Sequence, residues 1–449
     1  MIEASERAVE VALAAGASDA EAYASEARER EVRAHGGEIE SLTAATQRGL
    51  GLRAWIGTRV GFAYGTDLGD SGLEALAARA VEAARAADED EFAAPPEPSS
   101  VPQPVLELSD PSIDSWAMAE VAELALTVER EALAADPRIS GVEQAVYAGS
   151  ADRVAIASST GIAGEYESSS CYAYAMVLAK GEDGNAETGL GFDLARGPQA
   201  LDSVAAGREG AERATAMIGA GKPDSRSCSV VLDPTVAASF VGLIGGVLGA
   251  DAVQRGRSPF ADRLGTAVGG EALTLHDDGL DPSGPATAPF DGEGIASRRT
   301  ALIEAGSLRT FLFDSYTARR GGVESTASAG RGGYRSLPRV SASNLVVAGG
   351  SRAFEDLLAE AGEGVFVTDV AGLHSGVNPV TGVFSVGASG RSIRGGELAE
   401  PVREFTIASD LVSMLGAVRA AGADARWVPF GGSVSTPPLL IGEMTIAGA

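Results

Sequence analysis

The most distinctive polar segment of the chain is GLHSGVNPVTGVFS, which begins at Gly372. Glycines, Asn378 and Pro379 fix the path of such a turn, and loops of this kind often shape binding sites. The segment also holds His374, one of three histidines in 449 residues, beside Ser375. We therefore interpret His374, Ser375 and Asn378 as candidate substrate-binding residues. The alternative is an imidazole that bonds backbone carbonyls and only stabilises the turn.

A second polar segment, PFDGEGIASRRTALIEAGSL, places two carboxylates and two guanidinium groups near a predicted turn. Asp291 and Glu293 are the acids, and Arg298 and Arg299 are the bases. Structural ion pairing of these side chains is the first interpretation. The other is a contact surface for a peptide or a protein partner, which adds Asp291 and Glu293 to the candidate substrate-binding residues.

Familiar catalytic and metal-binding motifs are missing from the sequence. The histidines are far apart, so they form no HExxH helix, and Cys171 and Cys228 lack the paired spacing of a thiolate zinc site. GAGKPD around Lys222 lacks the Ser or Thr that ligates magnesium in a phosphate loop, and no GxSxG elbow occurs. Asp and Glu from distant segments could still converge, but we expect no metal and no cofactor in this chain.

Composition limits the environment and the partners of the protein. Lys and Arg total 35 against 62 Asp and Glu, a formal charge of −27, and such a surface repels phosphate backbones. The first residues show no secretory signal, and the longest apolar segment, residues 236–250, is shorter than the roughly 20 residues needed to cross a bilayer. Two cysteines cannot form a disulfide framework. We expect a cytoplasmic protein that binds neither nucleic acid nor membrane.

The first half of the chain predicts helices packed on a sheet. Two β-like segments predict a hairpin that turns near Gly57, and short β-rich segments lie between residues 142 and 194. We predict an N-terminal α+β domain over residues 1–220, with a mainly antiparallel sheet and a Pro-rich connection at about 93–112. Apolar spacing predicts helices at residues 4–15, 73–87, 114–135 and 201–218.

The second half of the chain is typical of a β-rich domain. The segment GAGKPDSRS marks the expected domain boundary near Gly221. Beyond it we predict one apolar helix from Pro234 to about Val253 and a short helix in FEDLLAEAG. The remaining segments are strand-like and separated by Gly-rich turns. We therefore predict a β-dominated C-terminal domain over residues 221–449 and an α+β fold class for the whole chain.

These segments resemble the TldD/PmbA family, also called the modulator-of-DNA-gyrase family, over nearly the whole chain. Several motifs in one order are more specific than any single motif. The resemblance implies an N-terminal α+β domain, a β-dominated C-terminal domain, and dimerisation that encloses a chamber. The matching segments are SSTGIAGEYESS from Ser158, RGRSPFADRLG from Arg255, PFDGEGIASRRTALIEAGSLRTFLFDSYTARR from Pro289, GLHSGVNPVTGVFS, and MTIAG from Met444.

The resemblance also points to a zinc site that this chain lacks. The catalytic TldD branch carries an HExxxH helix and a cysteine close to the C-terminus. Counted back from RGRSPF, the first His, the Glu and the second His fall on Val241, Gly242 and Gly246, and PFGGSVSTPPLL offers no cysteine. These side chains can neither ligate a metal nor carry a proton. The pattern is similar to the PmbA, or TldE, branch, whose members pair with a TldD-type zinc peptidase.

Three functions fit these residues. The first is a zinc-free, non-catalytic subunit that forms a heterodimer with a TldD-type zinc peptidase homologue and helps enclose unfolded or modified peptides for proteolysis. Zinc is then expected only in the partner. The second is a stand-alone enzyme that modifies peptides or small molecules at a site around His374. The third is a homodimeric binding or scaffold protein.

Overall fold

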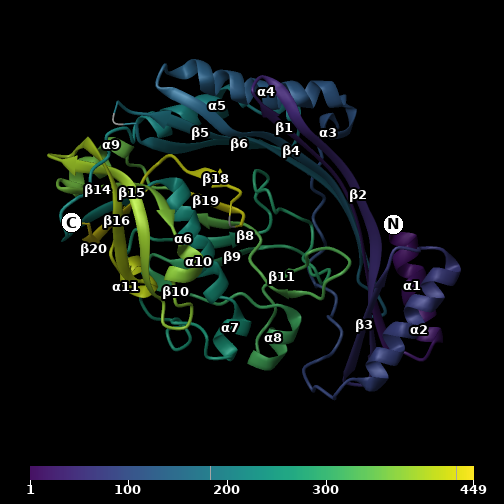
Figure 1. The fold of residues 1–449 in the computed structure, drawn as a ribbon. Coiled ribbons are helices and arrows are strands. Elements are labelled where there is room, and N and C mark those ends of the chain that lie inside the picture. The colour runs from purple at the N-terminus through teal and green to yellow at the C-terminus, as the bar shows by residue number, and fades with distance from the viewer. Residues whose placement is uncertain (183, 431, 449) are drawn as a thin grey trace.

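A broad antiparallel sheet from the N-terminal half of the chain arches over a β-rich body formed by the C-terminal half (Figure 1). The computed structural model describes residues 1–182, 184–430 and 432–448. Helices cover the outer side of the sheet, and its other side faces the body (Figure 1). The predicted α+β class is confirmed, with helices on an antiparallel N-terminal sheet followed by a β-dominated region.

The arched sheet has the strand order β3-β2-β1-β4-β5-β6, and every neighbouring pair is antiparallel. Its four longest strands have 17 to 20 residues, far above the usual five or six, so the sheet is unusually long in the strand direction. The hairpin predicted near Gly57 joins the second and third strands. The strands are β1 (Asp19–His35), β2 (Glu38–Ile56), β3 (Arg59–Gly65), β4 (Ile139–Ser158), β5 (Ala163–Lys180) and β6 (Ala186–Ala195).

Alternation along β1 gives the sheet two different faces, because successive side chains of a strand point to opposite sides. Ala20, Ala22 and Ala24 are buried on the outer face, where they pack in one cluster with residues of α1 (Ile2–Ala14) and α2 (Asp70–Ala86). The residues between them, such as Tyr23 and Ser25, therefore point to the opposite side. We call that side the inner face; it meets the C-terminal body.

The other end of the outer face is covered by α4 (Met118–Ala135) and α5 (Ser203–Thr215), next to the short α3 (Ser112–Ser115) and η1 (Pro198–Ala200). The prediction of one continuous helix over residues 114–135 is wrong at its start. Trp116 and Ala117 are extended, and the Glu120 carboxylate accepts a hydrogen bond from the Ala117 N–H at 2.6 Å, which caps a new helix. The other predicted N-terminal helices are confirmed to within a few residues.

A closed ring of five strands forms a small barrel in the C-terminal body. The strands run in the order β16-β15-β14-β7-β20, and β20 pairs again with β16, which leaves no open edge between them. β17 (Val418–Ala421) extends the sheet from β20. The barrel strands are β7 (Arg226–Leu232), β14 (Gly364–Ala371), β15 (Val383–Arg394), β16 (Glu397–Asp410) and β20 (Leu439–Ala447).

A second, smaller sheet completes the body, and the long apolar helix α6 (Pro234–Val247) shares one hydrophobic core with both sheets. A two-stranded ribbon, β11 (Ala329–Gly330) with β12 (Arg339–Val340), lies outside them. In pairing order, the second sheet consists of β10 (Ser307–Leu308), β9 (Arg299–Glu304), β8 (Leu275–Asp278), β13 (Leu345–Val347), β19 (Val434–Thr436) and β18 (Arg426–Val428).

The helix predicted from Pro234 to Val253 is broken. It ends at Val247, and a separate helix starts at Ala250, because the extended Gly249 bridges to Leu312 and the Ala250 N–H bonds the Leu312 carbonyl. The predicted short helix in FEDLLAEAG is confirmed. The remaining helices are α7 (Ala250–Gln254), α8 (Ser315–Gly321), α9 (Phe354–Ala361), α10 (Leu373–Gly376) and α11 (Leu411–Gly416).

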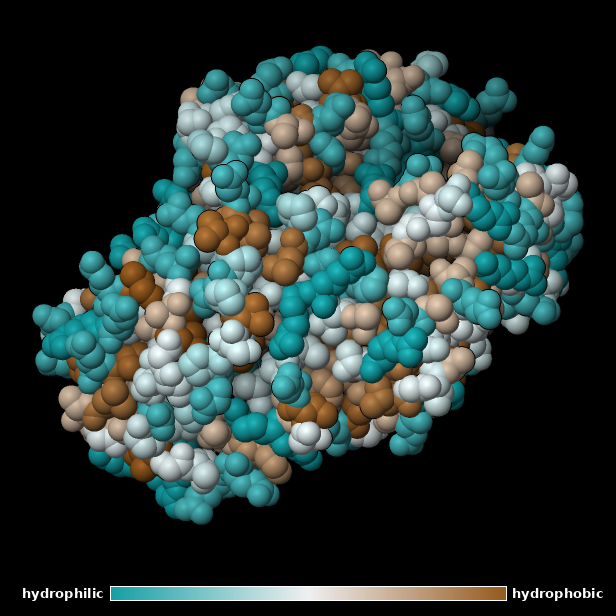
Figure 2. All heavy atoms as spheres, turned by 180° about the vertical axis from the view of Figure 1, so that it is seen from behind, coloured by the Kyte–Doolittle hydropathy of each residue, from teal (hydrophilic) through white to brown (hydrophobic). Residues whose placement is uncertain are grey.

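Residues 93–107 form neither helix nor strand, which agrees with their proline content. The division of the chain into domains at residue 220 stays a prediction. No helix of the described residues is both long and apolar enough to cross a lipid bilayer. Figure 2 shows hydrophilic residues over every part of the face seen from behind, interleaved with smaller hydrophobic groups.

Close packing between β6 and α5 gives a test of this architecture. A Cβ atom on Gly191 would lie 2.2 Å from the Ala206 carbonyl oxygen and 2.3 Å from the Gly210 nitrogen, and helix backbone cannot rotate away. We expect Gly191→Ala to lower the free energy of unfolding by about 1–3 kcal/mol in urea titrations followed by circular dichroism. Gly141→Ala in β4, where no atom lies within 4 Å, is the control. Equal effects would contradict the packing.

Candidate functional site

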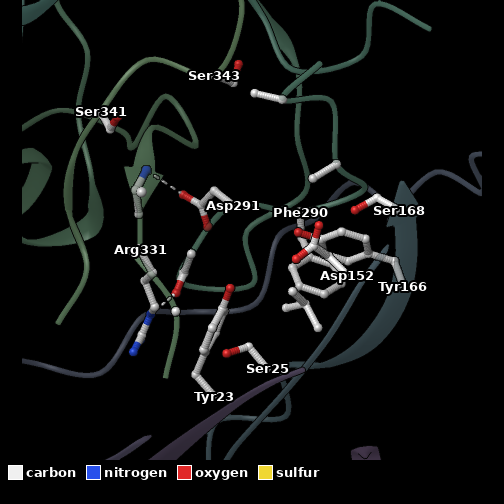
Figure 3. A pocket seen from close by; sticks show the side chains of 18 of the residues that line it. Tyr23, Ser25, Asp152, Tyr166, Ser168, Phe290, Asp291, Arg331, Ser341 and Ser343 are labelled. Carbon is white, nitrogen blue, oxygen red and sulfur yellow. Dashed lines mark hydrogen bonds between the residues drawn. The ribbon is translucent and has the colours of Figure 1, made fainter. Parts of the chain in front are cut away.

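A cavity of about 670 Å³ lies between the inner face of the arched sheet and loops of the C-terminal body (Figure 3). We call it the sheet cavity. One side is formed by strands β1, β4 and β5, and the other by two loop segments, residues 285–297 and 327–343. Its labelled lining residues in Figure 3 are Tyr23, Ser25, Asp152, Tyr166, Ser168, Phe290, Asp291, Arg331, Ser341 and Ser343.

Strand register explains why residues far apart in sequence meet on the floor of this cavity. Ser25 of β1 pairs with Val154 of β4, which pairs with Tyr166 of β5. Two residues further along β1, Ala27 pairs with Asp152 of β4, which pairs with Ser168 of β5. Side chains of directly paired residues lie about 5 Å apart on the same face. The pairing of the strands therefore determines which side chains are neighbours on the cavity floor.

Beside the cavity, four buried charged side chains join the two halves of the molecule. Arg53 and Glu21 come from the sheet, whereas Glu293 and Arg331 come from the loops of the body. The Arg53 Nε donates to Glu21 Oε1 at 3.0 Å, and Arg53 Nη2 lies 3.3 Å from Glu293. Arg331 donates to the same oxygen of Glu21, Oε1. We call these four residues the charge cluster.

The charges of the cluster compensate one another. Burial would raise the pKa of Glu293, but the attraction of Arg53 and the hydrogen bond from the Ser315 N–H at 2.9 Å outweigh it and lower that pKa. The Arg53 guanidinium also lies 5.0 Å from the Trp55 ring. Because each charge has a partner of opposite sign, the cluster is a structural link and not a reactive group.

The cluster of four residues predicted in PFDGEGIASRR does not form. Arg298 donates to the Ser325 carbonyl and Arg299 pairs with Asp278 at 3.5 Å, whereas Glu293 turns to Arg53. These loop residues bond to distant segments of the chain and not to one another. Glu293 and Arg299 are both in ion pairs, with Arg53 and Asp278 respectively.

Asp291 lines the sheet cavity, but its carboxylate already has backbone donors. It accepts N–H groups of Glu293 at 2.9 Å, Ile295 at 3.0 Å and Ala329 at 3.1 Å. Burial raises the pKa of Asp291 to about 7, repulsion by Glu293 adds to the rise, and these hydrogen bonds oppose it. Its first role is therefore to fix the loop that forms the cavity wall.

The predicted residues around His374 lie elsewhere, on α10 and the turn that leads into β15. The exposed His374 imidazole makes no hydrogen bond or ion pair with any residue that the structure describes. Ser375 Oγ donates to the Gly372 carbonyl, and Asn378 Oδ1 accepts the Val380 and Thr381 N–H groups at 3.0 and 3.2 Å. The structure thus does not bring His374, Ser375 and Asn378 together with Asp291 and Glu293.

The candidate metal positions on α6 do not fit a metal ion. Val241 is buried in the main core, and Gly242 and Gly246 on the same helix have no side-chain donor. A Cβ on Gly246 would meet no atom within 4 Å. Across the described ranges, no group of three or more His, Cys, Asp or Glu side chains is arranged to hold a metal ion.

Sequence reasoning missed most of the cavity floor and three of the four members of the charge cluster. Tyr23 and Asp152 belong to no motif, and Tyr166 lies in the segment SSTGIAGEYESS without having been singled out. The available signal was the alternation in AEAYASEA, which puts Glu21, Tyr23 and Ser25 on one face and alanines on the other.

An arched sheet joined by buried ion pairs to loops of a β-rich body, with a cavity between the sheet and those loops, defines an α+β protein built from two layers of different architecture. Three family models match the chain in succession: "PmbA/TldA metallopeptidase domain 1" at residues 20–84, the "central domain" at 111–218 and the "C-terminal domain" at 225–448. The chain belongs to the PmbA/TldD metalloprotease family.

Relatives match over the full length of the chain. Metalloprotease PmbA of Escherichia coli O157:H7 is 29% identical over 99% of this chain and 96% of its own. A PmbA homologue of Haemophilus influenzae is 30% identical over 98% and 94%. A crystal structure from Thermotoga maritima, described as a modulator of a DNA gyrase, matches with TM-score 0.91 and 25% identity over 99% of both chains. TldE of Thermococcus kodakarensis, at 21% identity, shares the fold with TM-score 0.90 over 99% of this chain and 100% of that one.

The charge cluster predicts a strong effect on stability. We expect Arg53→Met to lower the free energy of unfolding by about 3–5 kcal/mol, because Glu293 stays buried without its guanidinium partner. Arg59→Met, which breaks the exposed pair with Glu89, is the matched control and should cost less than about 1 kcal/mol. Chemical denaturation measures both variants. A small loss for Arg53→Met would mean that the cluster is not needed to hold the halves together.

Proposed function

We propose that this chain is a zinc-free, non-catalytic subunit that pairs with a zinc-bearing homologue of the same family and helps enclose peptides that the homologue cleaves. The observation that carries the proposal is the helix α6, where the positions of an HExxxH motif are Val241, Gly242 and Gly246. A metallopeptidase needs ligands that leave an open position for water and a base that takes its proton. Aliphatic and glycyl residues supply neither.

The packing of α6 supports this proposal. Val241, Phe240 and Ile244 are all buried in the main core, so the helix is built into the body as a structural element. His374 gives no support to a stand-alone site, because no described acid or nucleophile is bonded to its imidazole. A zinc-bearing homologue would therefore have to contribute the hydrolytic groups.

An unpaired strand edge supports binding of an extended peptide. Residues 50–56 of β2 pair with β3, whereas residues 38–49 pair with β1 alone among the strands that the structure describes. Their other edge therefore offers backbone groups without a strand partner in that part of the chain. Residues 41–47, SLTAATQ, carry neither charge nor proline, and Leu42 is 49% exposed. Native proteins usually protect such an edge with charges or proline. An edge left open suits an extended chain that adds a strand.

Reconstitution tests the proposed role directly. We expect the isolated chain to cleave no unfolded peptide and to hold no stoichiometric zinc in elemental analysis. Mixing it with an HExxxH homologue from the same organism should give a heterodimer in size-exclusion chromatography with light scattering, together with chelator-sensitive cleavage. The homologue alone and a homologue with its motif glutamate changed to glutamine are the controls. Cleavage by this chain alone, or a mixture without association, would contradict the proposal.

The open edge gives a second test. We expect the double variant Leu42→Lys and Ala44→Lys to weaken binding of a fluorescent unstructured peptide about tenfold or more in anisotropy titrations, because charges on an edge strand oppose strand addition. Leu133→Lys on α4 changes a similarly exposed leucine, 45% accessible, away from any strand edge, and should leave binding unchanged. Equal affinities of both variants would exclude the β2 edge as the binding surface.

A further inference from the structure

The floor of the sheet cavity carries polar groups that the protein leaves unpartnered. Tyr23 is only 7% exposed, and its hydroxyl points into the cavity between Asp291 and Tyr166 (Figure 3). Neither the Tyr23 nor the Tyr166 hydroxyl makes a hydrogen bond to any residue in the described part of the chain. Tyr23 is buried and Tyr166 is half-buried, and a phenol hydroxyl in such a cavity needs a ligand or water to complete its hydrogen bonds. These two hydroxyls therefore indicate a place for a polar ligand.

Negative charge on the same floor is not compensated. The Asp152 carboxylate accepts a hydrogen bond from Ser150 Oγ at 2.8 Å and forms no ion pair with a described residue. Glu29 lies two residues after Ala27 on β1, so its side chain is on the same face and also lines the cavity. Like Asp152, Glu29 forms no ion pair with a described residue. Burial raises the pKa of Asp152, and repulsion by Glu29 raises it further. Both effects would be relieved by a bound cation.

The cations that line the cavity are already engaged. The Arg331 guanidinium pairs with Glu21, donates to the Gly292 carbonyl at 2.6 Å and lies 4.7 Å from the Tyr23 ring. Arg335 donates to the Tyr334 hydroxyl at 3.0 Å and stacks on that ring. Neither guanidinium forms an ion pair with Asp152 or Glu29. The positive charge that would match these carboxylates must therefore come from outside the chain.

We propose that the sheet cavity is a subsite for a cationic side chain of a bound peptide, an arginine or a lysine. Asp152 and Glu29 receive the charged end, and the Tyr23 and Tyr166 hydroxyls accept its remaining N–H groups. The apolar stem of the side chain lies against Val154 and Phe290, since long cationic side chains bury their methylene groups while the head stays polar. The inference rests on the proposed function in taking the cation to belong to a peptide.

The neighbouring aromatic rings favour the same ligand. Phe290 packs edge-on against Tyr166 with ring centroids 5.1 Å apart, which fixes the position of the phenol on the floor. Cations bind favourably over such faces, and more strongly where water is excluded. The acidic floor would at the same time repel an acidic side chain, so the site discriminates by the sign of the charge.

Calorimetric titration of the full chain with small probes tests this subsite. N-acetyl-arginine amide and Nα-acetyl-lysine amide should bind at least about tenfold more tightly than N-acetyl-citrulline amide, a neutral molecule of nearly the same shape as the arginine probe. Asp152→Asn and Glu29→Gln should each remove most of that preference. Glu167→Gln changes an exposed carboxylate of β5 that does not line the cavity and should leave it intact.

The outcomes separate this inference from the proposed function. Equal binding of arginine and citrulline probes, or Asp152→Asn with unchanged preference, would overturn the cationic subsite even if the reconstituted pair cleaves peptides. If the chain prefers the arginine probe to the citrulline probe but never associates with a zinc-bearing homologue, the cationic subsite stands and the subunit role is rejected. Tyr23→Phe, which removes only the hydroxyl, serves as a second variant if Asp152→Asn does not fold, as judged by its melting curve.

Discussion

The charge cluster is the most deeply buried ionic link between the sheet and the body, because four charged side chains from distant segments meet in it. Glu21 and Arg53 face each other on neighbouring strands of the sheet, and Glu293 and Arg331 reach them from separate loops of the body. Buried charges are costly unless every one is paired, so the two halves reach low energy only in the arrangement that completes all the pairs. That condition fixes where the loops stand over the sheet and hence the shape of the cavity.

The length of the sheet strands then decides what the cavity contains. A strand of ordinary length would place about two or three side chains on each face, whereas β1, β4 and β5 place a longer series of them along the inner face. Apolar members of the series pack against Phe290, whereas Asp152 and Glu29 further along form no ion pair with a described residue. One sheet therefore contributes to a hydrophobic cluster at one point and to the floor of the sheet cavity a few residues away.

Local patterns in the sequence predicted much of the fold. The helices at 73–87 and 201–218 and the turn at Gly57 follow from periodicity and glycine, and the structure contains them. Breaks at Trp116 and Gly249 were missed because they depend on a cap and on a bridge to Leu312. The pairing of Asp152 with Ala27 and Ser168 depends on strand register over long separations, which no single segment encodes.

Closure of the barrel sets an order on how the chain can fold. β20 lies between β7 and β16, yet it is made long after β7. During synthesis, the edge of β7 that will pair with β20 therefore stays open until the end of the chain is made. By contrast, all six strands of the arched sheet are made before β7. Such late, long-range pairing slows folding and prolongs the exposure of hydrophobic edges. The C-terminal body is consequently the part of the molecule most dependent on protection from aggregation during synthesis.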